Sequence, residues 1–380
     1  MKVVPKKFKV HSLTGRITPE VMTRAFKTVK RNMGAAGIDK VSVEMFEKNL
    51  HQNLDALMRD LKSRSYVPFP LKRVHIPKGK GKSRSPGIPA VRCRVTQEVV
   101  RRLIAPIFER MFHHDSYGLI KGCNGHMAIE RNILFARKGY RVVLDADVMS
   151  FFDTISHKLF IELVAAEITD GNILGLIGKF LKSGVMEDSV LKSMKVGMPQ
   201  GGVISLFLAN IVLKHLDWQL HAQGYKFVRY ADDFIVMCKT IPQAEKALDF
   251  VRNVIEQDLE LKLSPEKTKI VKFVKEFEYL GFFISFQSAR IRASSEEKFK
   301  MKIRKLTRRS HNLDAEVIER LNRVIRRTVN FFSPPFSKTI TQFTLLCAWV
   351  RKRIRCIKYK RNWHSDNRRL KINIYTVSDC

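Results

Sequence analysis

The chain has 380 residues, 45% of them hydrophobic, which is enough for two or three structural units with a sizeable core. Lysine and arginine number 70 against 36 acidic residues, and the net charge of +34 indicates a polyanionic partner, with nucleic acid as the default. The sequence has no apolar run of about eighteen residues and no apolar signal-peptide core near Met1, which argues against a membrane or secreted protein and predicts a cytoplasmic one.

The N-terminal part is predicted to be helical and to lead into a basic hairpin. Residues 17–62 show helical periodicity, interrupted by a small-residue loop at 34–39. The alternating basic stretch 70–84 predicts a β-hairpin whose tip, with Lys80 and Lys82, can reach phosphates. From the residues alone, this hairpin fits a general RNA-binding stripe equally well. Residues 91–112 then have the spacing of a core helix.

Two predicted strand regions carry acids at their ends. Residues 141–147 predict a buried strand that ends at Asp147, with a helix after Asp153. Residues 227–237 predict two short strands joined at a tight turn that carries Asp232 and Asp233. Core helices are predicted over 203–220 and 241–259, and a strand pair over 277–284. This mixture of hairpins and helices favours an α+β fold over a doubly wound sheet.

The C-terminal quarter is predicted to form basic helices. Residues 291–380 carry 23 basic and 7 acidic side chains, so +16 of the +34 lies there. Ser294 and Glu297 have the capping-box pattern of a helix start, before an apolar face of Phe299, Ile303 and Leu306. A second helix is predicted from Asp314 to Pro334, and a third over 341–358 with inward Leu345, Leu346, Trp349, Val350 and Ile354. This leaves four cations for a polyanion: Arg351, Lys352, Arg355 and Lys358.

The acids at the strand ends predict a divalent-cation site. An ionised carboxylate among apolar neighbours must be paired or must bind a metal. Nucleotide addition needs two divalent ions about 3.5–4 Å apart, held by carboxylates. Asp147, Asp232 and Asp233 supply such groups from two elements, although Asp-Asp is also an ordinary turn dipeptide. Asp145 lies on the same strand face as Asp147, so periodicity leaves the choice between them open.

Seven short motifs occur in order along the chain, and together they resemble a group II intron-type bacterial reverse transcriptase, an RNA-directed DNA polymerase. The resemblance extends over residues from about 18 to 360. The motifs are Gly34-Ala35-Ala36-Gly37-Ile38-Asp39, Ile76-Pro77-Lys78 through Gly87-Ile88-Pro89, Asp147-Val148-Met149-Ser150-Phe151-Phe152-Asp153, Pro199-Gln200-Gly201-Gly202-Val203-Ile204-Ser205, Tyr230-Ala231-Asp232-Asp233, Leu263-Ser264-Pro265-Glu266-Lys267-Thr268 and Tyr279-Leu280-Gly281-Phe282.

This resemblance implies an α+β right-hand polymerase. Fingers and palm would occupy 1–290, with a helical extension and the start of the fingers in 1–65, the rest of the fingers in 66–140 and the palm in 141–290. A helical thumb, the maturase region of these proteins, would occupy 291–365, and a tail 366–380.

The resemblance also implies roles for single residues. Asp147, Asp232 and Asp233 match the catalytic triad that binds two Mg²⁺ ions, with Mn²⁺ as a substitute, and Asp153 matches a structural neighbour. Phe152 matches the bulky residue that excludes a ribose 2′-hydroxyl. Lys267 matches a proton donor to pyrophosphate, with a solvated lysine as the alternative. Lys78 and Arg84 match cations that neutralise the triphosphate. Gln200 and Tyr230 match residues that lie at the incoming nucleotide. Gly281 matches a residue of the turn that supports the primer end.

The implied partners are an RNA template, an RNA–DNA duplex, dNTPs and a structured cognate RNA, with no membrane. Three roles stay open: an intron reverse transcriptase, a maturase whose acids are idle, and a defence-associated enzyme with its own non-coding RNA. Some residues depart from the family pattern, such as Met149-Ser150 after Asp147. These departures fit either a decayed copy of a mobile-element enzyme or a lineage reassigned to another task. The six cysteines lack CxxC spacing, and no metal-ligand spacing follows Trp363, so we expect neither a zinc site nor an appended endonuclease.

Overall fold

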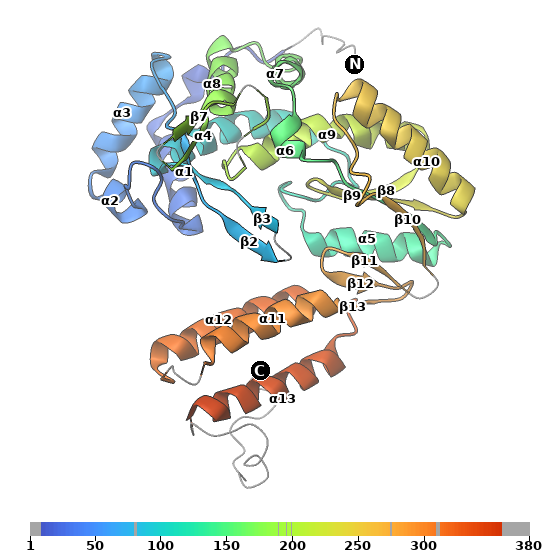
Figure 1. Cartoon of the computed structure of the whole chain (residues 1–380). Coiled ribbons are helices and arrows are strands. Elements are labelled where there is room, and N and C mark those ends of the chain that lie inside the picture. The colour runs from blue at the N-terminus through green and yellow to red at the C-terminus, as the bar shows by residue number, and fades with distance from the viewer. Residues whose placement is uncertain are drawn as a thin grey trace. The chain divides into compact units, whose positions relative to one another are not determined.

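A computed structural model describes residues 9–79, 82–188, 190–194, 196–198, 200–273, 276–308 and 312–358 (Figure 1). The chain divides into two compact units. Unit 1 comprises Met1–Asn124 and Val142–Ile270, and unit 2 comprises Gly125–Arg141 and Val271–Cys380. The expected palm–thumb boundary at residue 290 lies inside unit 2, and the assignment of fingers, palm and thumb stays a prediction.

Unit 1 begins with helices α1 (Pro19–Asn32), α2 (Val43–Lys48), α3 (Leu50–Lys62) and α4 (Val91–Phe108). The Thr18 hydroxyl caps α1 by accepting a hydrogen bond from Val21 N, and Pro19 opens its first turn. The buried face of α1 packs against α4, which is itself buried on nearly every side. The helix expected over 91–112 is thus confirmed, with its last residues in a 3₁₀ turn, Glu109–Met111.

A small sheet and a hairpin follow these helices. The sheet has the order β4-β1-β6-β7, with β1 Leu71–Arg73, β4 Gly87–Ile88, β6 Val185–Glu187 and β7 Val190–Lys192. The expected basic hairpin is confirmed as the antiparallel pair β2 (Ile76–Gly79) and β3 (Lys82–Arg84). Its predicted tip residue Lys80 lies outside the described residues.

A larger sheet, with β5, β8 and β9 in unit 1, has the order β10-β5-β9-β8. Its strands are β5 (Val142–Ala146), β8 (Lys226–Tyr230), β9 (Asp233–Cys238) and β10 (Lys269–Lys272). β5 and β8 both pair antiparallel with β9, which is buried from Phe234 to Cys238. The surrounding helices are α6 (Phe151–Thr154), α7 (His157–Ala165), α8 (Gly171–Lys182), α9 (Ser205–Ala222) and α10 (Ile241–Asn253), with a π-helical turn at Val254–Asp258. The strand, hairpin and core-helix predictions for this region are therefore confirmed, within a few residues at their ends.

Unit 2 combines a three-stranded antiparallel sheet with helices. The sheet has the order β11 (Phe277–Tyr279), β12 (Phe282–Ile284) and β13 (Ala289–Ile291). The helices are α5 (Gly125–Arg137), α11 (Ala293–Leu306), α12 (Ala315–Phe332) and α13 (Ile340–Lys358). The Phe282 ring centroid lies 4.7 Å from that of Phe332, which joins the sheet to α12. Asp314 caps α12 through Val317 N, as the sequence predicts.

Two predictions in unit 2 are wrong. The capping box at Ser294 does not form, because α11 already begins at Ala293 and its N-cap, Arg292, makes no side-chain cap. The Ser295 hydroxyl instead donates to Gly281 O at 3.0 Å, a partner 14 residues earlier. Leu345 was expected to point inward but is 67% exposed, while Leu346 is buried. Among the described residues, no helix is both long and apolar enough to cross a bilayer.

Candidate active site

The predicted aspartate pair lies at the turn of the β8–β9 hairpin. Tyr230 pairs with Asp233, so Ala231 and Asp232 alone make the turn. Ala231 has φ +58°, in the left-handed region that a side chain with a Cβ enters at a cost of about 1–2 kcal/mol. Asp232 and Asp233 therefore project from a sharply turned, strained segment whose conformation the surrounding structure must impose.

The register between β5 and β9 places Asp147 beside this turn. β5 pairs with β9 so that Ala146 lies opposite Phe234, and Asp147 follows directly at the end nearest Asp233. The segment after the π-helical turn fixes this end of β5: Ser264 N donates to Asp147 O at 2.8 Å, and Met149 N donates to Lys262 O at 2.8 Å. The backbone thus brings the three predicted acids to one edge of the sheet.

The electrostatics show that these carboxylates act on one another. Removal from water raises the pKa of the Asp233 carboxyl to about 6, and repulsion from Asp232, Asp147 and Asp145 acts in the same direction. Asp233 is itself an exposed residue at the start of β9.

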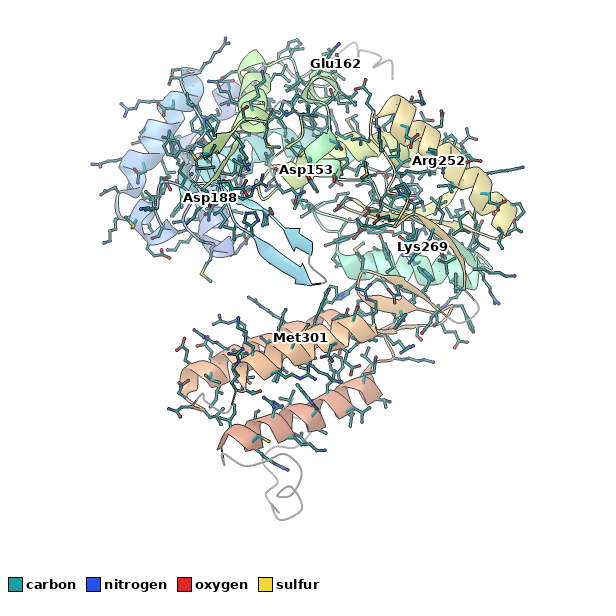
Figure 2. All side chains as sticks on the ribbon, in the orientation of Figure 1. Asp153, Glu162, Asp188, Arg252, Lys269 and Met301 are labelled. Carbon is teal, nitrogen blue, oxygen red and sulfur yellow. The ribbon has the colours of Figure 1, made fainter. Side chains whose placement is uncertain are left out.

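Lysines partly neutralise this cluster. Lys267 Nζ lies 2.6 Å from Asp147 Oδ2, and Lys269 Nζ lies 3.6 Å from Asp145 Oδ2 (Lys269 is labelled in Figure 2). Both lysine side chains are largely exposed. Two ammonium groups beside four gathered carboxylates leave an excess of negative oxygen ligands, which is the donor set that hard divalent cations such as Mg²⁺ take. The residues present therefore fit a divalent-cation site.

Gln200 lies close to Asp153, the residue that follows Phe152 on α6. Phe152 is buried in α6, and its backbone O accepts from Met198 N at 2.6 Å. Gln200 Nε2 lies 3.5 Å from Asp153 Oδ2, on α6 (Figure 2). Burial raises the pKa of Asp153, and the charge of Arg73, a residue that the sequence analysis did not single out, opposes the shift.

Packing within the chain explains why a glycine follows Gln200. A Cβ at Gly201 would lie 2.1 Å from Gly87 O, so only glycine lets this loop run against β4. Gly87 N also donates to Gln200 O at 2.6 Å, which fixes the backbone of Gln200 to the same strand.

The other predicted residues fall on several elements. Lys78 is on β2, Lys82 and Arg84 are on β3, and Tyr230 ends β8. Gly281, with φ +86°, makes the β11–β12 turn of unit 2, where its O accepts from Arg292 N at 3.1 Å. Arg351, Lys352, Arg355 and Lys358 are on α13; Lys352 is exposed, and Arg351 and Arg355 are half-buried.

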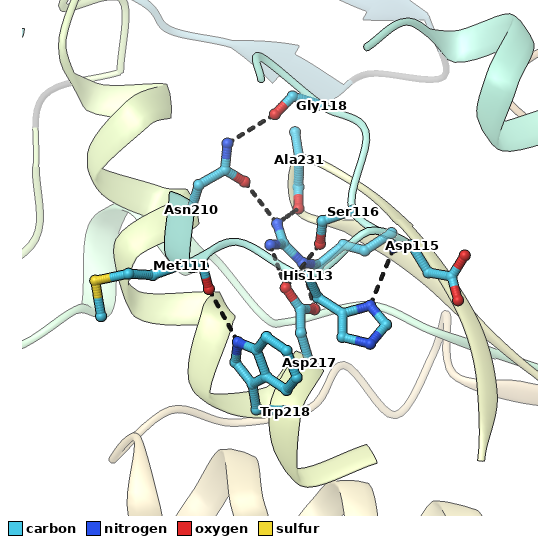
Figure 3. Close-up of polar contacts among 10 residues, drawn as sticks. Met111, His113, Asp115, Ser116, Gly118, Asn210, Asp217, Trp218 and Ala231 are labelled. Carbon is cyan, nitrogen blue, oxygen red and sulfur yellow. Dashed lines mark hydrogen bonds and ion pairs between the residues drawn. The ribbon is translucent and has the colours of Figure 1, made fainter. Parts of the chain in front are cut away.

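A group of histidines in unit 1 has the spacing of a metal site, but the ring nitrogens of His113 are used in hydrogen bonds. His113, His114 and Asp115 bring ligand atoms within 4.8 Å of one another. His113 Nδ1 accepts from Asp115 N at 3.0 Å, which leaves its Nε2–H to donate to His221 Nδ1 at 3.0 Å (His113 and Asp115 in Figure 3). Burial lowers the pKa of His113 to about 4, so the ring is neutral and both its nitrogens are engaged.

Comparisons with known proteins identify two matching families. Residues 76–284 match the family described as "Reverse transcriptase (RNA-dependent DNA polymerase)", and residues 296–375 match the "Group II intron, maturase-specific domain". Protein YkfC of Escherichia coli (strain K12) is 32% identical over 303 residues, which cover 69% of this chain and 80% of that protein. The group II intron-encoded protein LtrA of Lactococcus lactis subsp. cremoris is 26% identical over 358 residues, which cover 77% of this chain and 58% of LtrA.

Solved structures of low sequence identity also match. A telomerase from Candida albicans has a TM-score of 0.46 at 12% identity, covering 82% of this chain and 60% of that one. A partial Cas6-RT-Cas1–Cas2 complex has a TM-score of 0.41 at 21% identity, covering 65% of this chain and 42% of that one.

Proposed function

The chain belongs to the group II intron-type reverse transcriptases, a family of RNA-dependent DNA polymerases with a maturase-specific domain, and we propose that it adds deoxynucleotides to a primer on an RNA template. The observation that carries this proposal is the gathering of Asp147, Asp232 and Asp233 at one sheet edge, where removal from water and repulsion between the carboxylates raise the pKa of Asp233. A cluster of acids that repel one another in this way is suited to binding cations.

Asp147, Asp232 and Asp233 would bind the two Mg²⁺ ions. When bound, such ions lower the pKa of the primer 3′-hydroxyl and neutralise charge on the triphosphate. The strained turn holds Asp232, and Asp233 follows it as the first residue of β9. The backbone of Asp147 is held by the hydrogen bond from Ser264 N. The chain's own contribution is thus to keep the carboxylates at fixed positions before substrate arrives.

Neighbouring side chains position the nucleotide and handle protons. Phe152, which is buried and whose backbone O accepts a hydrogen bond from Met198 N, would exclude a ribose 2′-hydroxyl. Lys267, with its ammonium at the cluster, is placed to donate a proton to the leaving pyrophosphate. The hairpin residues Lys78 and Arg84 would neutralise the triphosphate.

The direct test is primer extension by the purified protein on poly(rA) annealed to oligo(dT), with dTTP and Mg²⁺. We expect primer extension that stops when the metal is chelated. We also expect extension when Mn²⁺ replaces Mg²⁺. A homogeneous, folded preparation that extends no primer with either ion would contradict the proposal.

A second function, intron RNA binding and splicing support, is favoured by the maturase-specific match over 296–375 and by the +16 charge of residues 291–380. Cations on helices bind RNA largely through its backbone phosphates. Self-splicing of a group II intron should therefore be stimulated by the protein, and equally by a variant with Asp232→Asn and Asp233→Asn. Loss of stimulation in that variant would show that the two roles are not independent.

A further inference from the structure

A fully buried arginine lies directly behind the aspartate turn. Arg229, on β8 two residues before Ala231, is 0% exposed. Its Nε donates to Asp217 Oδ1 at 2.8 Å and its Nη2 to Asp217 Oδ2 at 2.6 Å, a bidentate pair. Its Nη1 donates to Asn210 Oδ1 at 2.7 Å and to Ala231 O at 2.8 Å. One guanidinium therefore connects a core helix to the turn.

The partners of Arg229 are themselves held in place. Asn210 and Asp217 lie on α9 two helical turns apart, and both are 0% exposed. Asp217 also accepts from Ser116 Oγ at 2.7 Å, and Asn210 Nδ2 donates to Gly118 O at 2.7 Å. Figure 3 shows Asn210 and Asp217 on one helix, with Gly118 and Ala231 beside them. The network is thus closed, with each of these polar groups paired.

The loop that carries Ser116 and Gly118 also packs against the turn. Tyr117 N donates to Arg229 O at 2.9 Å, and a Cβ at Gly118 would lie only 2.1 Å from Ala231 N. Ala231, left-handed at φ +58°, is therefore confined between the Gly118 backbone and the Arg229 guanidinium.

The bond to Ala231 O has a geometric consequence for the catalytic acids. That oxygen belongs to the planar peptide that ends at the Asp232 Cα, so fixing it fixes the plane of this peptide and restricts the directions in which the Asp232 side chain can leave the backbone. A buried ion pair as such adds little stability over well-packed apolar residues. The feature that apolar residues cannot replace here is the hydrogen bond that Arg229 donates to the turn.

We propose that Arg229, anchored by Asp217 and Asn210, is a positioning residue that holds the Ala231–Asp232 peptide, and with it the metal-binding carboxylates, in the orientation used for nucleotide addition. This inference rests on the proposed polymerase function and names a residue that acts through Asp232 and Asp233.

A paired replacement separates positioning from stability. Arg229→Gln alone leaves Asp217 charged and unpaired in the core, so that variant is expected to unfold. The double variant R229M/D217L removes both charges and keeps apolar volume, so its unfolding temperature should return toward the wild-type value. Its kcat should nevertheless fall about 10–100-fold, the usual effect of removing a residue that orients metal ligands. The KM for dTTP should stay within about twofold, because nucleotide contacts are unchanged.

A second readout does not depend on turnover. Binding of Mn²⁺ alone, followed by loss of the free-ion EPR signal, should weaken by about 10-fold or more in R229M/D217L. Glu98→Gln is the matched control, because Glu98 is 1% exposed and pairs with Arg101 and Arg102 on α4. This variant should lose stability while its kcat and Mn²⁺ affinity stay at the wild-type level.

The outcomes are distinct. R229M/D217L with wild-type kcat and Mn²⁺ affinity at a restored unfolding temperature would overturn the inference. If that double variant does not fold, Arg229→Lys decides: its single ammonium preserves the charge opposite Asp217, and an unchanged kcat would again overturn the inference. A wild-type protein that binds Mn²⁺ but extends no primer would contradict the proposed function, and the Mn²⁺ readout would then decide the inference by itself.

Discussion

The Lys267 ammonium lies 2.6 Å from Asp147 Oδ2, although the lysine side chain is 66% exposed. An ion pair with so much exposure is weak, worth about 0–1 kcal/mol, so a divalent cation can displace the ammonium from Asp147. In the proposed reaction, the displaced Lys267 ammonium would stay beside the cluster and serve as the proton donor. The pair therefore joins the cation site to the proton-transfer group of the proposed reaction.

Replacing Lys267 should separate these two effects. In Lys267→Met, Mn²⁺ binding in the absence of substrate should tighten by up to about fivefold, because the competing ammonium is gone. The kcat should fall about 10²–10⁴-fold, because the general acid is gone. Single-nucleotide incorporation and EPR titration measure the two quantities. A kcat equal to that of the wild type would show that Lys267 is only a solvated lysine.

Gly118→Ala should disable the turn without affecting the rest of the fold. The added Cβ would lie 2.1 Å from Ala231 N, a backbone atom that cannot move away without shifting Asp232. We expect kcat to fall at least about 10-fold, with RNA affinity unchanged, in the primer-extension and filter-binding assays. Gly178→Ala on α8 is the control, because nothing lies within 4 Å of its added Cβ. Equal activities of the two variants would contradict the prediction.

Asp170 should make unfolding depend on pH. Its carboxylate accepts from Leu13 N at 2.9 Å and Thr14 N at 2.7 Å, and it caps α8 through Asn172 N and Ile173 N. Burial acts to raise the pKa of Asp170, but hydrogen bonds from Thr14, Ile173 and Leu13 outweigh it, so the pKa lies below its ordinary value. A depressed pKa contributes stability that is present above the unfolded-state pKa of about 3.9 and is lost as pH falls through the folded-state value.

Asp170→Asn should therefore destabilise unit 1 by about 1–3 kcal/mol at pH 7. The difference from the wild type should shrink as pH falls from about 3.9, the unfolded-state pKa, through the lower folded-state pKa, below which the wild-type side chain is uncharged as asparagine is. Urea unfolding at a series of pH values measures this difference. A loss of the same size at every pH would contradict the charge-based explanation.

Lys352 should contact RNA through phosphate. It is exposed on α13, so removing its charge should leave the fold intact. Lys352→Ala should weaken binding similarly for unrelated RNA sequences and reduce the slope of log K against log salt by about one. Lys246→Ala, an exposed lysine on α10, is the control and should leave the slope unchanged. Identical slopes for both variants would remove α13 from the RNA-binding surface.

The hairpin and the strand ending at Asp147 could be predicted because their residues alternate and because charges at the ends of apolar strands stand out. The absence of a capping box at Ser294 could not be predicted, because a local pattern contains no information on tertiary contacts: α11 begins one residue earlier, at Ala293, and the Ser295 hydroxyl bonds to the distant Gly281 O. Leu345 was misplaced because it neighbours Leu346 in sequence, whereas i and i+1 residues on a helix face different directions.

Arg229 was missed because a basic residue in a strand is ordinarily on a solvated face. A signal was present in the helix before it, where the polar residues Asn210 and Asp217 are seven positions apart within a largely apolar segment. Two such groups on one buried face require partners, and a nearby arginine is the group that can satisfy both.

The central claim is tested most directly by comparing primer extension by Asp147→Asn, Asp232→Asn and Asp145→Asn variants on poly(rA) and oligo(dT), with RNA affinity measured in parallel. The account predicts that the first two variants bind RNA as the wild type does but extend no primer, whereas Asp145→Asn keeps measurable extension. Extension that persists in Asp147→Asn or Asp232→Asn would contradict it.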